Sequence, residues 1–152
     1  MHIIDLDNEH EDIYLVCLCE WNKSMEEVKG IKKNWYNKMK GRGLKVKIAF
    51  TDENIPGGMI EYMPAEYFSV EGSDLYIVSC IMVHGYEGKG RGNLRGKGLG
   101  KALLKAAEED VRAMGKKGLA AWGLVDEECM DSPWFEKQGY KKADEKGGRY
   151  LV

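Results

Sequence analysis

The sequence predicts one domain of the α/β (α+β) class, and three observations support this prediction. The chain has 152 residues, of which 43% are hydrophobic and 32% charged, which suits a single core of ordinary size. The run at 75–83 is apolar and β-branched, as in a buried strand. A helical repeat of apolar residues follows at 98–114, and an alternating pattern typical of a half-buried strand precedes at 44–50. Strands and helices are therefore expected to alternate along one chain.

The first half of the chain carries signals for two helices and a hairpin. We expect a strand at 2–6, a short helix at 9–20, a helix from 24 to about 40, and strands at 44–50 and 59–63 around a turn at 52–58. Ser24 followed by Glu27 forms a capping box, which predicts Ser24 as the N-cap of the longer helix. Apolar residues on one face of this helix are expected to pack on the core: Val28, Ile31, Trp35 and Met39.

The second half begins with an irregular connection at 64–73. We then expect a strand at 75–83, a helix at 98–114, a strand at 119–125, a short helix near 132–138, and strands at 140–143 and 149–152 around a polar turn. Ser132 and Pro133 suit the cap and first turn of the short helix, and Gly139 its end. The sequence stops within the last predicted strand, so we expect either a short strand or a longer parent protein.

Composition and charge exclude some classes of function. A net charge of −2 argues against a general nucleic-acid binder. No apolar run approaches the roughly 18 residues of a membrane span, and Met1–Asp5 lacks the pattern of a signal peptide. The four cysteines show no paired spacing, so we expect reduced thiols, no metal site and a cytoplasmic protein.

The glycine-rich segment at 95–100 lies between the predicted strand at 75–83 and the helix at 98–114. Glycine lets the chain turn sharply and bring backbone N–H groups close to a ligand. The start of the helix adds unpaired amides and the positive end of its dipole. Cations gather around this segment, namely Lys89, Arg91, Arg95, Lys97, Lys101 and Lys105. The segment therefore predicts a site for a phosphate.

Neither a Walker loop nor a dinucleotide fingerprint fits this segment. The pattern that fits is Arg-x-x-Gly-x-Gly, in which Arg95, Gly98 and Gly100 hold the fixed positions. This resembles the coenzyme A pyrophosphate loop of the GNAT N-acetyltransferases. Residues 134–140 (Trp-Phe-Glu-Lys-Gln-Gly-Tyr) are similar to that family's late F-Y-E-K-x-G-F segment. The predicted order of elements is similar to the family's across essentially the whole chain.

The resemblance implies a mixed, mostly antiparallel sheet that splays at the cofactor site, with helices on both faces. It implies acetyl-CoA as cofactor and a primary amine, on a small molecule or a peptide, as acceptor; a homodimer stays open. An amide near Met82 would polarise the thioester carbonyl, and the strands at 75–83 and 119–125 would separate around the pantetheine arm. The residues expected to bind the cofactor are Ile81, Met82, Val83, Arg95, Gly96, Lys97, Gly98, Leu99, Gly100 and Lys101.

The sequence departs from the family pattern in its central loop and in its catalytic residues. The loop at 84–94 is several residues longer than usual, and its run Gly88–Gly92 offers a competing register for the phosphate site. We favour 95–100, because it alone adjoins the helix. The tyrosine that often serves as general acid aligns with Phe135, and the strand at 75–83 has no carboxylate. Glu61 and His84 are then the candidates for the base, and Tyr140 and Cys129 for the acid.

Three functions remain open on this evidence. The leading one is acetyl transfer from acetyl-CoA to an amine. The second is a CoA-binding sensor or regulatory domain without strong catalysis, and the third is an RNA-contacting module that uses the Arg/Gly-rich loop. The acceptor is expected to contact the loops at 19–23, 64–73 and 144–147.

Overall fold

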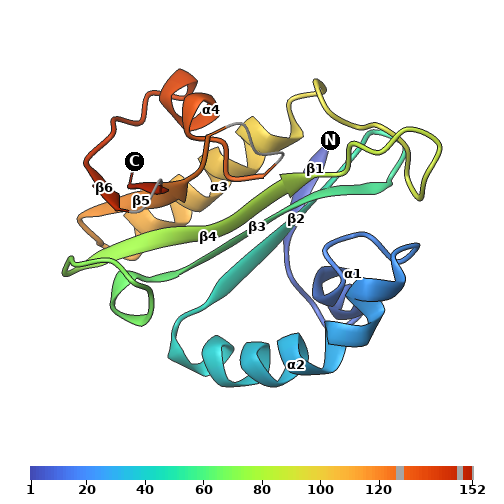
Figure 1. Cartoon of the computed structure of the whole chain (residues 1–152), viewed down its shortest axis with the longest axis horizontal. Coiled ribbons are helices and arrows are strands. Elements are labelled where there is room, and N and C mark those ends of the chain that lie inside the picture. Colours follow the sequence, from blue (N-terminus) through green and yellow to red (C-terminus); the bar gives the residue numbers. More distant parts are fainter. Residues whose placement is uncertain (126–128, 147–148, 152) are drawn as a thin grey trace.

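The computed structural model describes residues 1–125, 129–146 and 149–151. Within this part, seven strands form one sheet in the order β1-β2-β3-β4-β5-β7-β6. Helices α3 and α4 lie on one face of the sheet and α1 and α2 on the other (Figure 1). The helices are α1 (Glu11–Leu15), α2 (Lys23–Met39), α3 (Leu99–Ala113) and α4 (Ser132–Lys137). The strands are β1 (His2–Asp5), β2 (Lys45–Phe50), β3 (Pro56–Pro64), β4 (Leu75–Val83), β5 (Gly118–Gly123), β6 (Asp144–Lys146) and β7 (Arg149–Leu151).

The sheet opens between its two parallel strands. Residues 75–78 of β4 pair with 118–121 of β5, but beyond that point β5 pairs with β7 instead. Every other strand pair in the sheet is antiparallel. From Ser79 to Val83, strand β4 therefore pairs with β3 along one edge, and its other edge has no partner strand among the described residues. The predicted mixed, mostly antiparallel sheet with helices on both faces is confirmed, and so are the predicted bounds of β4.

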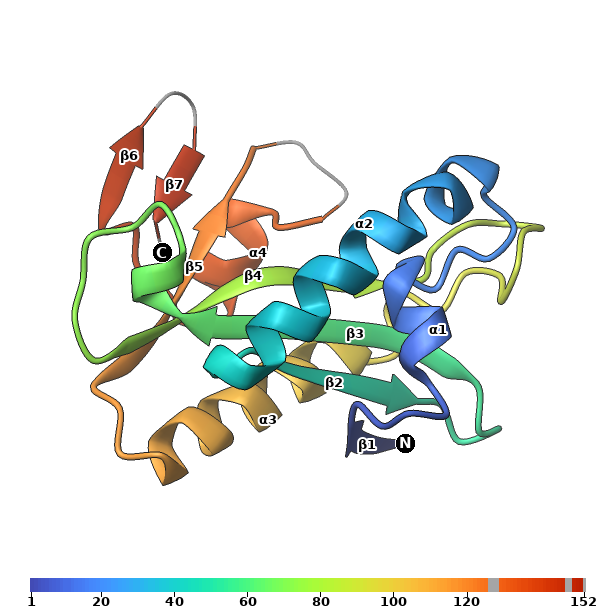
Figure 2. The same cartoon turned by 90° about the horizontal axis from the view of Figure 1, so that it is seen from below.

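Each face of the sheet has its own buried cluster. Leu103, Ala107 and Val111 of α3 pack on one face together with Ile81 and Phe135. Tyr14, Leu15 and Leu18 pack on the opposite face with Met59 and Met82. Because successive side chains of a strand point to opposite faces, Ile81 and Met82 of β4 belong to different clusters. The open part of β4 thus borders both layers of the molecule (Figure 2).

The helix predicted at 9–20 is much shorter than expected. It ends at Leu15, because Cys17 and Leu18 adopt left-handed backbone conformations, with φ of 51° and 58°, that an α-helix cannot contain. The predicted N-cap of α2 is also wrong: the cap is Asn22, whose side chain accepts a hydrogen bond from the Ser24 amide at 3.0 Å.

The apolar face predicted for α2 is only partly buried. Met39 is 6% exposed, whereas Val28 is 47% and Ile31 74% exposed. The helix instead turns Tyr36 and the ammonium of Lys32 toward α1, where Tyr36 meets the Tyr14 ring edge to face. An apolar pattern alone does not say which flank of a helix meets the sheet.

Other corrections concern the C-terminal elements and the central hairpin. Asp131, not Ser132, caps α4, since its side chain accepts from the Trp134 amide at 3.2 Å. The strand predicted at 140–143 lies instead at Asp144–Lys146, where a polar turn was expected. Strand β3 begins at Pro56, so the turn predicted at 52–58 is shorter. The predicted strand at 149–152 and the predicted acceptor loop at 144–147 each end on a residue, Val152 and Gly147, that lies outside the described residues.

Two further findings bear on the class of protein. All four cysteines are free thiols. In the part of the chain that the structure describes, no helix is both long and apolar enough to cross a membrane.

Candidate functional site

A cavity of about 540 Å³ lies where β4 and β5 separate. Its walls come from the end of β4, the glycine-rich loop with the start of α3, and the segment that leads into α4; it is called the β4–α3 cavity below. It is lined by Ile81, Met82, Val83, Leu94, Arg95, Gly96, Gly98, Leu99, Gly100, Lys101, Cys129, Met130, Asp131 and Trp134. Of the residues predicted to bind the cofactor, only Lys97 does not line it. The cavity reaches both faces of the sheet, because Ile81 belongs to one buried cluster and Met82 to the other.

The start of α3 presents unpaired backbone N–H groups to this cavity. Among the described residues, the amides of Gly98, Leu99, Gly100 and Lys101 have no acceptor, as is normal for a first helical turn. Gly98 is the N-cap, with φ of 85° and no side-chain cap. A side chain there would be strained, so the glycine is required by the turn itself. Free amides, the helix dipole and the nearby Lys101 together favour an anion.

The competing glycine run at Gly88–Gly92 does not line the β4–α3 cavity, and two of its amides are already bonded within the loop. The Lys89 amide donates to the Tyr86 carbonyl at 3.4 Å, and the Gly92 amide to the Lys89 carbonyl at 2.9 Å. Arg91 is likewise engaged with Glu20. The run forms the tip of a tight loop, and no helix follows it. The geometry therefore supports the register at 95–100.

The backbone of β4 offers hydrogen-bonding groups to the cavity at alternate residues. His84 donates its amide to Gly57 at 2.8 Å, so even-numbered residues of this stretch face β3. Odd-numbered residues face the opening, since alternate residues bond to opposite sides in an antiparallel strand. The Ser79 carbonyl, on that side, accepts from Trp122 Nε1 at 2.9 Å. The backbone groups of Ile81 and Val83, on either side of Met82, therefore face the cavity.

A buried carboxylate lies on the α1/α2 face beside this opening. Glu61 of β3 is 6% exposed and pairs across the sheet with Cys80. Ser79 Oγ donates to its Oε1 at 2.5 Å, and the Tyr14 hydroxyl donates to its Oε2. Burial, together with the charge of Glu61, raises the pKa of Tyr14, so this hydroxyl remains a donor. Burial and the same carboxylate raise the pKa of the Cys80 thiol.

Lys32 of α2 contacts Tyr14, one of the two donors to this carboxylate. Its ammonium lies 4.2 Å from the centroid of the Tyr14 ring and donates to the Tyr14 carbonyl at 3.1 Å. It also contacts Cys17 Sγ at 3.4 Å. Buried charges persist only where hydrogen bonds and opposite charges compensate for lost hydration. Sequence reasoning missed Tyr14, Ser79 and Lys32, because these partners come from three different elements.

The structure places the other catalytic candidates in structural contacts. His84 is fully buried; its Nε2 accepts from Trp21 Nε1 at 3.1 Å and its Nδ1 donates to the Gly92 carbonyl at 2.7 Å. The Tyr140 hydroxyl donates to Glu108 of α3 at 2.9 Å, and burial, aided by this bond, raises its pKa. Like Glu61, neither residue lines the β4–α3 cavity. Cys129 does line it, beside Met130 and Asp131.

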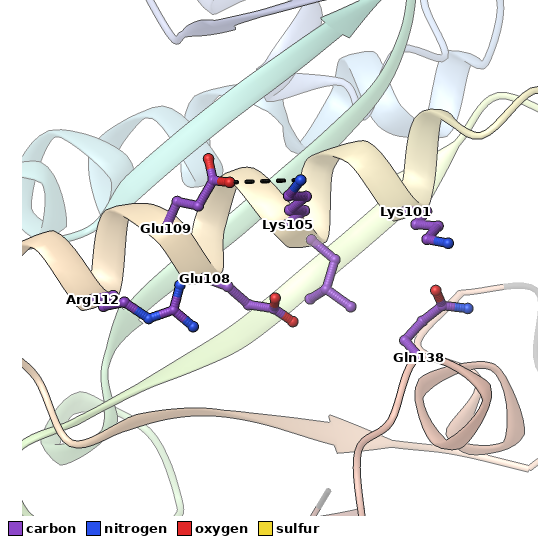
Figure 3. A pocket seen from close by; sticks show the side chains of 7 residues that line it. Lys101, Lys105, Glu108, Glu109, Arg112 and Gln138 are labelled. Atoms are coloured by element: carbon purple, nitrogen blue, oxygen red, sulfur yellow. Dashed lines mark ion pairs between the residues drawn. The ribbon is translucent and has the colours of Figure 1, made fainter.

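A second hollow, of about 330 Å³, lies on the outer side of α3 (Figure 3). It is lined by Lys101, Leu104, Lys105, Glu108, Glu109, Arg112 and Gln138. Lys105 and Glu109 form an ion pair at 3.9 Å there, and the lining holds three cationic and two anionic side chains in all. Lys101 lines both hollows, so the two meet at the start of α3.

Sequence comparisons give no match: no family model and no curated protein matches the chain. Solved structures do match. They include the PaiA N-acetyltransferase of Thermoplasma acidophilum in complex with coenzyme A, with a TM-score of 0.67 and 17% identity, covering 99% of this chain and 97% of the other. Ribosomal-protein-alanine N-acetyltransferase of Brucella melitensis has a TM-score of 0.65 at 20% identity, with 99% and 94% covered. The aminoglycoside 6'-acetyltransferase type Ii matches with 0.65 and 17%, again with 99% and 94% covered.

These matches span the whole fold, and they define the class of structure. The chain has the fold of the GNAT acetyltransferases, so the resemblance seen in its sequence is confirmed at the level of the fold.

Proposed function

We propose that the protein is an acetyl-CoA-dependent N-acetyltransferase. The observation that carries the proposal is the β4–α3 cavity, in which the unpaired amides of α3 and the open edge of β4 line one continuous space. A pyrophosphate suits the amides of Gly98–Lys101, and an extended amide-containing arm suits the free edge of a strand. The fold neighbours are acetyltransferases, one of them in complex with coenzyme A.

In this proposal the cofactor's thiol end reaches the α1/α2 face near Met82. The N–H of Ile81 faces that end and would donate to the thioester oxygen as negative charge develops on it. Cys129 and Trp134 would exclude water from the other side of the arm. The acceptor amine would approach from the α1/α2 face, because the buried carboxylate of Glu61 lies on that face.

Glu61 is the proposed base, since it is the carboxylate buried beside this opening. Tyr14 and Ser79 each donate to one of its oxygens and fix its orientation. With both oxygens engaged, Glu61 would take the proton of an incoming ammonium through a water molecule. The amine then attacks the thioester carbon, the C–S bond breaks, and the thiolate leaves. A thiol has an ordinary pKa of about 8.5, so the leaving group needs little help from an acid.

A CoA-binding domain without strong catalysis is the second candidate. Phe135 favours it, since it is fully buried and has no proton to donate. Against the RNA-contacting module stands Arg91, whose guanidinium is already engaged by Glu20. The acceptor stays open, because fold neighbours are named for acceptors as different as an aminoglycoside and a ribosomal-protein alanine. Free cysteines are typical of reducing compartments, which supports a cytoplasmic location as part of this proposal.

Calorimetric titration with acetyl-CoA tests the cofactor, with a short RNA as the comparison. We expect acetyl-CoA to bind and RNA not to bind. Release of free thiol from acetyl-CoA in the presence of a panel of primary amines then separates the enzyme from the sensor. Failure to bind acetyl-CoA at millimolar concentration would overturn both. Binding without thiol release for any amine would leave the sensor.

A further inference from the structure

The loop at 84–94 forms a hairpin that leads into the β4–α3 cavity. Gly85 and Asn93 form an antiparallel bridge, and the Leu94 amide donates to the His84 carbonyl at 2.8 Å. Leu94 itself is buried and lines the β4–α3 cavity. The hairpin therefore joins directly, through Leu94, to the loop at 95–101 that would bind the pyrophosphate.

At the tip of this hairpin, Arg91 binds the connection between α1 and α2, residues 16–22. Arg91 Nη1 donates to the Leu18 carbonyl at 2.7 Å and to Glu20 Oε2 at 2.6 Å, and Arg91 Nη2 donates to Glu20 Oε1 at 2.5 Å. The guanidinium thus holds one backbone carbonyl and a bidentate carboxylate, the geometry that suits arginine best. The Arg91 side chain is only 15% exposed.

A second contact, between Trp21 and His84, joins the base of the hairpin to the same connection. Trp21 Nε1 can only donate, so His84 Nε2 accepts and His84 Nδ1 carries the proton that bonds to the Gly92 carbonyl. Trp21 also covers the tip so closely that a Cβ on Gly90 would lie 2.6 Å from its ring. The hairpin therefore contacts the α1–α2 connection both at its base and at its tip.

The connection that Arg91 holds is strained. Cys17 and Leu18 are consecutive L-residues with positive φ, and such conformations persist only where the surroundings enforce them. Their side chains are placed on the α1/α2 face: Leu18 is fully buried beside Met82 and Tyr14, and Cys17 packs on the same cluster. If the connection relaxed, the wall of the proposed acceptor side would change shape.

We propose that Arg91 is a positioning residue, which couples occupancy of the cofactor cavity to the order of the α1–α2 connection. This inference rests on the proposed function, because it takes CoA as the occupant. CoA bound at 95–101 would restrict the motion of Leu94 and of the hairpin at 84–94. Arg91 would then restrict the motion of Leu18 and Glu20 through its hydrogen bonds to them. The acceptor wall would then be held more firmly when the cofactor is present.

Hydrogen exchange of the full chain, with and without CoA, tests the coupling. No described residue from Tyr14 to Asn22 lines the cavity, so any protection there is indirect. In the wild type we expect CoA to slow exchange both at 98–103 and at 14–22, the latter by about fivefold or more. In Arg91→Gln, CoA is expected to protect 98–103 as before and to leave 14–22 nearly unprotected. Arg91→Lys keeps the charge without the fork and should be intermediate.

Two controls keep the result interpretable. Arg42→Gln removes a surface cation that lies over the Tyr67 ring, and it should behave like the wild type. Glu20→Gln removes the bidentate partner while leaving Arg91 in place, so it should reproduce the loss if Arg91→Gln fails to fold. Protection of 98–103 without any at 14–22 in the wild type would overturn the coupling and leave CoA binding intact. No protection anywhere, and no heat of binding, would overturn the coupling and the proposed function together.

Discussion

Replacing Tyr14 by phenylalanine removes the hydroxyl of a fully buried residue and leaves the ring in place. Lys32 retains its contact with the ring face, so the change isolates the hydrogen bond to Glu61. Hydrogen bonds to charged groups contribute about 1.5–3 kcal/mol, and a buried acceptor left without its donor adds desolvation cost. We therefore expect Tyr14→Phe to lower the free energy of unfolding by about 2–3 kcal/mol. For a chain of this size that corresponds to a fall in Tm of about 4–10 °C.

A double-mutant cycle with Glu61→Gln assigns this loss to the pair. In the Glu61→Gln background the acceptor is neutral, so Tyr14→Phe should cost only about 1 kcal/mol. Urea unfolding followed by circular dichroism measures both values, provided that the m-value stays constant. Tyr67→Phe is the matched control, because Tyr67 is 45% exposed, and it should change stability by less than about 0.5 kcal/mol. Equal losses in both backgrounds would refute the buried network as described.

Three further predictions concern the cofactor, acid pH and thiol reactivity. Gly100→Val should weaken CoA binding at least about a hundredfold in calorimetry, because a Cβ there would lie 3.3 Å from Trp134 and its methyl groups would fill the cavity; unchanged affinity in the folded variant would exclude this register. The hydrogen bond to its arginine partner holds the pKa of Glu20 below its ordinary value; its stabilisation is thus present above about pH 4.5 and lost as pH falls through the folded pKa. Glu20→Gln should flatten that acid limb in pH-dependent unfolding, and an identical pH profile would contradict the assignment. Burial raises the pKa of Cys80, so iodoacetamide should alkylate it far more slowly in the folded than in the urea-unfolded protein, as read by mass spectrometry; equal rates would contradict the raised pKa.

The sequence was sufficient for the elements whose signals are local. Strand β4 and helix α3 have long, regular patterns, and their predicted positions agree with the structure to within one residue at each end. The family resemblance implied residues 81–83 of the cavity, and residues 95–101, of which Lys97 does not line it, were expected from the glycine-rich segment between these two elements. The free amides at Gly98 also follow from local rules for helix starts.

The remaining features depend on contacts between distant segments. Helix α1 ends at Leu15 because Cys17 and Leu18 adopt left-handed backbone conformations. The Leu18 carbonyl accepts a hydrogen bond from Arg91, which lies 73 positions later in the chain. No pattern near residue 17 signals this. The donors to Glu61 are similarly remote, at separations of 47 and 18 residues. Met130 and Asp131 of the cavity wall were missed, because their segment contains neither periodicity nor a distinctive motif.

The most direct test of the account is the fate of the acetyl group. Wild-type protein and Glu61→Gln are incubated with acetyl-CoA and the primary-amine panel, and free thiol and the masses of the amines are followed together. The account predicts that one or more amines gain the mass of one acetyl group in step with thiol release. Glu61→Gln should slow this by about 10²–10⁴-fold while binding CoA normally. Thiol release without any acetylated amine, or an unchanged rate in Glu61→Gln, would contradict it.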